Sequence, residues 1–305
     1  MKAAEVLAIA SLPPLCLYIV VLLTLVRRRG TEPFNQSMYR LMRVLGVCDV
    51  CGTLYTGAYR SLSRHYRVII GGKALALTLF IVCDISYGLS LIIQTLIAAN
   101  RMSAILFLTK YQLIWNTRLM LTIWIFLCLY GLYTALSFYV SYNFAMVFDF
   151  DHFDFLYANE TEAALRTPID YYMLPQYVVL MLTVLLVSLC YSVAVLGLRR
   201  LYKTLGSSSA NERSRRQREV KLLLVGVLSS ASLLIMVGCY PFRGLNAHMP
   251  VVLEAIGYCY YCANPFVYLA VDSGLRQEVK RFVLRRGKPS ASQTANAQVQ
   301  AASRK

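Results

Sequence analysis

Seven apolar stretches constrain the fold of this 305-residue chain more than any other feature of its sequence. An α-helix needs about 20 residues to cross the hydrocarbon core of a bilayer, and every stretch reaches that length. The stretches are Val6–Val26, Met38–Leu62, Ala74–Leu96, Leu119–Tyr142, Tyr171–Leu198, Leu222–Phe242 and Pro250–Val271. Short polar connections separate them, and no internal repeat of the kind that many transporters carry is visible. The sequence therefore predicts an all-α membrane protein with one seven-transmembrane helix bundle.

Composition and charge agree with this prediction and orient the bundle. Apolar residues make up 58% of the chain and charged residues only 15%, against about 25% charged in soluble domains. With the N-terminus outside, 24 of the 31 Lys and Arg residues fall on the inner side, as the positive-inside rule requires. The N-terminus is therefore predicted outside and the C-terminus in the cytoplasm. Because inner loops account for most of the positive charge, the lipid bilayer is the expected partner and a nucleic acid is not.

Three segments are expected along the chain. Residues 1–271 form the seven-transmembrane domain. Residues 272–287 form a short amphipathic eighth helix on the membrane surface, because apolar residues recur there at i, i+4, i+7 and i+8 from Leu275 among basic ones. Residues 288–305 are rich in Ser, Ala, Gln and Asn and are expected to be a disordered cytoplasmic tail. The outer loop after the fourth stretch carries Asn159 in an Asn-Glu-Thr sequon, a predicted glycosylation site.

Ionisable side chains inside the predicted spans are the first functional candidates, because charges at membrane depth are costly and rare. Asp49 lies in the middle of the second span, Asp84 lies in the third, and Glu254 lies near the outer end of the seventh. Arg101 closes the third helix. One interpretation is that these groups are neutralised locally and hold helices together. Another is that the acids relay ions, as they would in a transporter.

Prolines mark two places where helices are expected to bend. Pro265 lies six residues before the end of the seventh span, where it removes a backbone donor and clashes with the preceding turn. Asn264 stands beside it, and Tyr268 lies about one helical turn further on. Pro241 lies in the sixth span, one residue before its predicted end, and is also expected to kink its helix. The inner ends of both helices are therefore expected to move.

Five short motifs at compatible spacings resemble those of rhodopsin-like G-protein-coupled receptors. They are Leu45 with Asp49, Ser90, Asn100-Arg101-Met102, Trp124, and Asn264-Pro265-Phe266-Val267-Tyr268. Their counterparts in that family are the Leu-x-x-x-Asp of helix two, a helix-three serine, Asp-Arg-Tyr, a helix-four tryptophan and the Asn-Pro-x-x-Tyr of helix seven. The resemblance implies that Asp49, Ser90 and Asn264 converge as the polar sodium site of the family.

Departures from the family pattern change the expected switch. Asn100 replaces the acid beside Arg101, and Lys221 stands where many members have a glutamate, so an ionic restraint on the arginine is in question. Cys239 stands in place of the toggle tryptophan, and the first helix lacks the family's asparagine. The segment from Asn100 to Ile105, with the run Tyr111-Gln112-Leu113-Ile114-Trp115 after it, resembles nematode serpentine chemoreceptors, notably the G and V classes.

The resemblance implies a chemosensory receptor in the plasma membrane, for which a sensory cilium is a consistent location. A small extracellular ligand would shift a conformational equilibrium, and Arg101 would then meet a heterotrimeric G protein. No bond is made or broken, so neither an enzyme activity nor a cofactor is expected. The predicted activation switch comprises Asp49, Ser90, Asn100, Arg101, Pro241, Asn264, Pro265 and Tyr268. The candidate ligand contacts are Cys83, Asp84, Tyr87, Cys239, Glu254 and Tyr258.

Other classes of membrane protein fit the sequence less well. A retinal-type photoreceptor needs a lysine in the last span, and there is none between Leu222 and Leu275. An intramembrane hydrolase needs clustered catalytic or metal-binding residues, whereas the three histidines are scattered across outer loops. A membrane transporter that uses its buried carboxylates for ion or proton coupling remains the alternative.

Overall fold

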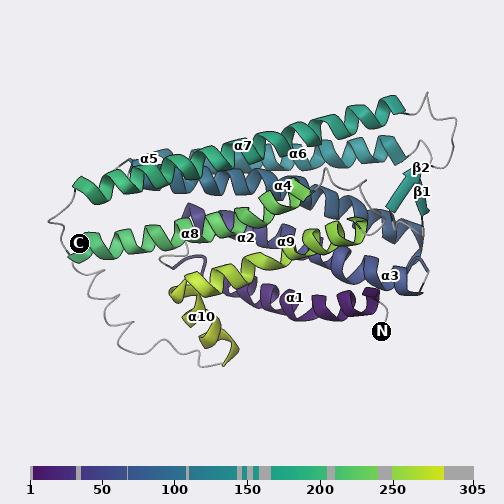
Figure 1. The fold of residues 1–305 in the computed structure, drawn as a ribbon, viewed down its shortest axis with the longest axis horizontal. Helices are drawn as coiled ribbons and strands as arrows, with labels where there is room; N and C mark the ends of the chain where they lie inside the picture. Colours follow the sequence, from purple (N-terminus) through teal and green to yellow (C-terminus); the bar gives the residue numbers. More distant parts are fainter. Residues whose placement is uncertain are drawn as a thin grey trace.

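The computed structural model is an elongated bundle of long helices with short elements at both ends (Figure 1). It describes residues 3–31, 36–66, 68–107, 110–142, 146–149, 154–157, 166–204, 210–239 and 249–284. The helices are α1 (Ala3–Arg27), α2 (Ser37–Thr53), α3 (Arg60–Tyr66), α4 (Gly72–Leu106), α5 (Tyr111–Ile114), α6 (Thr117–Tyr142), α7 (Arg166–Thr204), α8 (Ala210–Cys239), α9 (Met249–Val271) and α10 (Ser273–Val283). A π-helical turn, η1 (Leu54–Tyr59), joins α2 to α3. The predicted sites at Asn159 and Pro241 and the tail from residue 288 lie outside the described residues.

The prediction of a helical membrane protein is confirmed. Four helices within the described part of the chain are long and apolar enough to cross a membrane, namely over Ala10–Arg27, Ala74–Leu106, Thr117–Ser137 and Val178–Arg200. The loop between α6 and α7 adds a hairpin of β1 (Met146–Asp149) and β2 (Asp154–Tyr157), paired antiparallel with Phe148 opposite Phe155. Sequence analysis did not predict this hairpin, although aromatic residues such as these favour strands.

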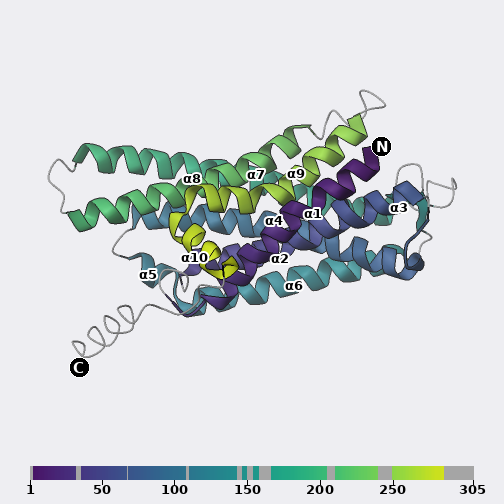
Figure 2. The ribbon, with the colours of Figure 1, turned by 90° about the horizontal axis from the view of Figure 1, so that it is seen from below.

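The two ends of the bundle carry different elements. The N-terminus, α3 and the β1–β2 hairpin lie together at one end, and α5 and α10 lie at the other (Figures 1 and 2). α4 is the central helix and packs most extensively against α2 and α7. Along α4, Asp84 lies about a third of the way from its start and Arg101 lies close to its end, so about half of the helix separates the two side chains.

α4 extends beyond its predicted end at Leu96 and ends at Leu106. Ala98 and Ile105 are buried against α7 and α8, so the packed apolar face of the helix continues past the polar pair Asn100 and Arg101. The prediction that Arg101 closes the helix is therefore wrong, because burial of this face outweighs the local polarity that suggested a boundary. Asn100 and Arg101 lie inside a continuous helix, which fixes the directions of their side chains.

Prolines inside α1 create a link between α1 and α9. Pro14 has no backbone N–H, so it cannot donate to the carbonyl of Ala10, one turn earlier. In lipid a freed carbonyl needs another donor, and the Tyr258 hydroxyl of α9 donates to Ala10 O at 3.0 Å. A residue expected to contact the ligand therefore has a structural partner.

The contact between α2 and α9 is close because it is built on a glycine. A Cβ atom at Gly52 would lie 2.4 Å from Cε1 of the Tyr261 ring, so only glycine fits at this position. The Thr53 hydroxyl, on the next residue, donates back to the carbonyl of Asp49 at 2.8 Å. This approach brings the inner part of α9, with Asn264, alongside Asp49 on α2.

α10 begins directly after α9 and docks on the bundle. The Asp272 carboxylate caps its first turn by accepting hydrogen bonds from the backbone of Gly274 at 3.0 Å and of Leu275 at 3.1 Å. Leu275 and Val279 are buried in the core between helices, whereas Val283 is 58% exposed. Part of the apolar face that sequence analysis assigned to the membrane therefore packs on protein, and a location on the membrane surface stays a prediction.

Candidate functional site

A buried carboxylate joins three helices in the middle of the bundle. Asp49 on α2 is fully buried. Its Oδ2 atom accepts a hydrogen bond from the Tyr18 hydroxyl of α1 and another from Asn264 Nδ2 of α9, the latter at 2.6 Å. We call Asp49, Tyr18 and Asn264 the Asp49 cluster. Its hydrogen bonds tie α1, α2 and α9 together at membrane depth, where such groups must find partners within the protein.

Tyr18 is a functional candidate that sequence reasoning missed. The first helix lacks the asparagine of the resembling family, and in the structure the phenol of Tyr18 donates to the carboxylate of Asp49. Tyr18 is only 2% exposed. The available signal was chemical rather than a motif, because a hydroxyl in the middle of an apolar span must find a hydrogen-bond acceptor.

The predicted convergence of Asp49, Ser90 and Asn264 is only partly direct. Asp49 and Asn264 are hydrogen-bonded, whereas the Ser90 hydroxyl pairs with the Tyr260 hydroxyl of α9 at 2.8 Å. Asp49 Oδ1 and Asn264 Oδ1 are buried and have no partner among the described residues. Oxygen atoms of this kind are suitable ligands for a hard cation. The residues therefore fit the sodium site that the family implies, and its occupancy stays a prediction.

A second polar network lies at the α5 end of α4 and contains a closed ring of three residues. Asn100 Nδ2 donates to the Ser37 hydroxyl of α2 at 2.9 Å, and this hydroxyl lies 2.8 Å from the Tyr111 hydroxyl of α5. The Tyr111 hydroxyl donates to Asn100 Oδ1 at 3.1 Å, which closes the ring. We call Ser37, Asn100 and Tyr111 the polar ring. Its members are all uncharged.

The polar ring holds the guanidinium of Arg101. Arg101 Nη2 donates to Asn100 Oδ1 and makes a longer contact of 3.5 Å with the Tyr111 hydroxyl. Arg101 is 2% exposed, so the arginine that was predicted to meet a G protein is covered in this conformation. Lys221, where the resembling family often has an acid, is exposed on α8. The oxygens of Asn100 and Tyr111, both neutral, are thus among the partners of the arginine.

A second contact fastens α5 over this site. Trp115, which directly follows α5, donates from Nε1 to the Ser103 hydroxyl of α4 at 2.6 Å. The same hydroxyl donates to the backbone carbonyl of Asn100 at 3.0 Å. The run Tyr111–Trp115, which sequence analysis selected only for its resemblance, therefore attaches a short helix to α4 through its first and last residues.

The candidate ligand contacts lie toward the opposite end of the bundle and do not surround one described cavity. Cys83 is buried and interacts with Tyr261 of α9. Asp84 is only half-buried and acts electrostatically on Tyr130 of α6, whose hydroxyl lies over the next turn of α4 at Gly88. Successive residues on α4 thus face different neighbours.

The remaining candidates are dispersed. Tyr87 packs beside the buried Leu91 and Tyr260, and Tyr258 donates to the α1 backbone. Cys239 ends α8 and Glu254 lies within α9, but the side chains of both are outside the part of the chain described.

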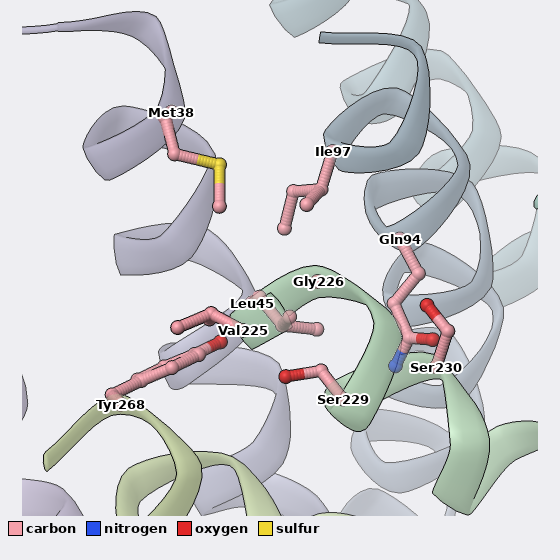
Figure 3. A pocket seen from close by; sticks show the side chains of 9 residues that line it. All are labelled: Met38, Leu45, Gln94, Ile97, Val225, Gly226, Ser229, Ser230 and Tyr268. Atoms are coloured by element: carbon pink, nitrogen blue, oxygen red, sulfur yellow. The ribbon is translucent and has the colours of Figure 1, made fainter. Parts of the chain in front are cut away.

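Among the other predicted switch residues, Pro265 and Tyr268 are buried within α9. Tyr268 lines a small cavity between α2, α4, α8 and α9 (Figure 3). None of the six candidate ligand contacts lines this cavity. It lies deeper in the bundle, between the Asp49 cluster and the polar ring.

Comparison with known proteins agrees with the resemblance seen in the sequence. A family model described as "Serpentine type 7TM GPCR chemoreceptor Srx" matches residues 65–249, which is more than half of the chain. No curated protein matches. The matched region contains Asn100, Arg101 and Tyr111, whereas Asp49 and Asn264 lie outside it. The serpentine-chemoreceptor prediction is confirmed, with Srx as the matching class where the G and V classes had been singled out. The chain belongs to the Srx family of serpentine seven-transmembrane G-protein-coupled chemoreceptors.

Proposed function

We propose that this receptor transmits the binding of a small extracellular ligand to a heterotrimeric G protein in the cytoplasm. The observation that carries the proposal is the burial of Arg101 beneath the polar ring at the α5 end of the bundle. A basic side chain held by neutral hydrogen bonds is available for a cytoplasmic partner once those bonds break. Membership of a receptor family also favours this function over transport.

The proposed orientation places the N-terminus and the β1–β2 hairpin outside and α5 and α10 in the cytoplasm. Basic residues at the α10 end of the bundle support this orientation. Two of them, at the end of α1 and on α10, contact the same carboxylate of α10. Arg28 pairs with Glu278 at 2.8 Å, and Arg281 pairs with the same carboxylate at 2.6 Å. Such residues are typical of cytoplasmic surfaces next to a membrane. The receptor would act in the plasma membrane.

Activation would break the polar ring. Its hydrogen bonds, together with that from Arg101 to Asn100, contribute about 1 kcal/mol each, or on the order of 4 kcal/mol in total. Turning a 1:99 equilibrium into 99:1 takes a difference in ligand affinity of about 5.5 kcal/mol. The two values are of the same order, so a ligand that binds the open state more tightly than the closed state by this amount is able to open the ring.

The ligand would enter from the end of the bundle that carries the N-terminus and contact α4 near Cys83, Asp84 and Tyr87. Whether the ligand is a cation can be tested with Asp84→Ala. A receptor for amines should lose its response to cationic agonists and keep its response to neutral ones. Equal responses of the variant and the unaltered receptor to cations would exclude a role for this carboxylate in recognition.

The function is tested by expressing the chain in cells that carry reporters for several G proteins and applying small volatile and water-soluble metabolites. Arg101→Ala should abolish the response while surface expression persists. Arg118→Ala is the matched control, because it removes the same charge from an exposed position at the start of α6. A normal response from Arg101→Ala would contradict the proposed mechanism.

A further inference from the structure

The first turn of α2 is held by side chains that reach other helices. Its N-cap residue, Gln36, makes no side-chain hydrogen bond to this turn, although the first N–H groups of a helix have no partner within it. Ser37 and Tyr39 are both buried in the turn. Because they are two residues apart, their side chains point to nearly opposite sides of the helix. The start of α2 is therefore held from two sides.

One of these side chains belongs to the polar ring, and the other binds α10. The Ser37 hydroxyl lies 2.8 Å from the Tyr111 hydroxyl of α5. The Tyr39 hydroxyl donates a hydrogen bond to Oδ2 of Asp272 at 2.7 Å. One helical turn therefore connects the polar ring with α10.

Asp272 also fixes the start of α10. Its other carboxylate oxygen, Oδ1, accepts hydrogen bonds from the backbone of Gly274 and Leu275, so one carboxylate both caps α10 and holds α2. The Leu275 side chain is fully buried in the same apolar cluster as Tyr39. Hydrogen bonding and packing together place α10 against the start of α2.

Two further helices anchor α10. The guanidinium of Arg276 donates to the carbonyls of Leu269 at 2.8 Å and Ala270 at 2.7 Å, in the last turn of α9. Glu278 pairs with Arg28, next to the end of α1, at 2.8 Å, and α10 lies close to this end of α1 in Figure 2. α5, by contrast, is a helix of only four residues. Of the two short helices that bind the start of α2, α10 is therefore the firmer support.

We propose that α10 positions the polar ring, because Asp272 holds Tyr39 and thereby keeps Ser37 where the other members of the ring bind it. Tyr39 and Asp272 are positioning residues, since they act through Ser37. A movement of α10 is transmitted through one turn of α2 to the cover of Arg101. The positioning follows from the geometry of the four helices, whereas its effect on signalling rests on the proposed function.

Hydrogen exchange of the purified unliganded receptor tests the positioning. The amides of Leu113, Ile114 and Trp115 form the backbone hydrogen bonds of α5, so their exchange reports how often this helix opens. Tyr39→Phe removes one hydrogen bond, which should speed their exchange about two- to fivefold. Tyr59→Phe is the matched control, because it removes a tyrosine hydrogen bond of 3.0 Å at the other end of the bundle. An unchanged rate in Tyr39→Phe, or an equal rise in both variants, would overturn the proposal.

A double-mutant cycle shows whether the effect passes through Ser37. Ser37→Ala breaks the link between α2 and the polar ring, so Tyr39→Phe should add little to the exchange of α5 in that background. Effects that add in full would overturn the proposal, because additivity is the behaviour of independent sites.

Arg276→Ala keeps the test valid if Tyr39→Phe fails to fold. Arg276 is exposed, and its removal loosens α10 from α9 while Asp272 and Tyr39 remain. The exchange of α5 should rise here too, and an unchanged rate in the folded variant would overturn the proposal.

Basal signalling of the same variants is a separate measurement. It should rise with the exchange of α5 if the polar ring restrains the resting receptor. Faster exchange with unchanged signalling would support the positioning and contradict the proposed function. Higher signalling without faster exchange would overturn the positioning.

Discussion

The Asp49 cluster and the polar ring around Arg101 each bury one ionisable side chain, but they are built differently. In the cluster, donors from α1 and α9 converge on one carboxylate oxygen of α2. In the ring, neutral groups of α2, α4 and α5 hold one guanidinium. The cluster links long helices, whereas the ring depends on α5, a helix of four residues fastened by two side chains. This difference indicates a permanent joint in the middle of the bundle, formed by the Asp49 cluster, and a releasable one at the α5 end, formed by the polar ring.

The largest effect on stability is expected from removing the carboxylate of Asp49, which is the hydrogen-bond acceptor of the Asp49 cluster. Asp49→Leu strands the hydroxyl of Tyr18 and the amide of Asn264, and should destabilise the receptor by about 2 to 4 kcal/mol, because each buried donor loses its partner. Thermal unfolding of the purified receptor measures this change. Asp49→Asn, which keeps an acceptor oxygen, is the control and should remain folded. Equal melting temperatures for Asp49→Leu and the unaltered receptor would show that the Asp49 cluster does not stabilise the bundle.

A methyl group at the α2–α9 contact should weaken the joint without touching its hydrogen-bonding groups. Gly52→Ala places a Cβ atom 2.4 Å from the Tyr261 ring, and overpacking of this kind costs about 1 to 3 kcal/mol. Gly257→Ala on α9 is the matched control, since its Cβ would meet nothing within 4 Å. Thermal unfolding should separate the two variants, and similar melting temperatures would show that the helices can move apart freely.

A contact outside both regions tests whether stability and signalling are separate. Tyr258→Phe leaves the carbonyl of Ala10 without the donor it has in the structure, which should cost up to about 1 kcal/mol in stability. Basal signalling should stay unchanged, because the polar ring is intact. Tyr133→Phe makes the same change at a residue that is 47% exposed. A rise in basal signalling with Tyr258→Phe but not with Tyr133→Phe would show that a contact outside the polar ring also restrains the resting state.

The smallest effect is expected from loosening the second attachment of α5. Ser103→Ala removes the hydroxyl that accepts from Trp115. A loss of about 0.5 kcal/mol in the resting state corresponds to roughly a twofold rise in basal signalling. Ser273→Ala, at an exposed position on α10, is the control. A G-protein reporter measures both, and equal basal activity would show that Trp115 does not restrain α5.

The sequence predicted which polar residues lie inside the bundle better than it predicted their hydrogen-bond partners. Apolar length and buried ionisable residues pointed to a helical bundle with Asp49, Asn264 and Arg101 inside it, and the structure joins Asp49 directly to Asn264. Tyr18 escaped notice because a single tyrosine in an apolar run belongs to no motif. Its role depends on α1 and α2 lying side by side, which spacing along the chain does not reveal.

Other differences arise from packing that local patterns do not encode. Arg101 suggested the end of a helix, yet burial of Ile105 carries α4 through to Leu106. The contact of Tyr258 with a ligand stays a prediction, and the structure adds a hydrogen bond that the sequence did not predict, from Tyr258 to the carbonyl of Ala10, which Pro14 has no N–H to satisfy. Both the end of α4 and the hydrogen bond of Tyr258 are set by contacts between segments that are distant in the sequence.

The central claim is that neutral hydrogen bonds around Arg101 hold the receptor at rest. Basal signalling of Tyr111→Phe tests it most directly, because this change removes one hydroxyl from the polar ring and keeps the aromatic ring. Two hydrogen bonds of the polar ring are lost, so at about 1 kcal/mol each ligand-free signalling should rise roughly 20- to 30-fold at equal surface expression. Tyr133→Phe should leave it unchanged. Basal signalling of Tyr111→Phe at the level of the unaltered receptor would contradict the account.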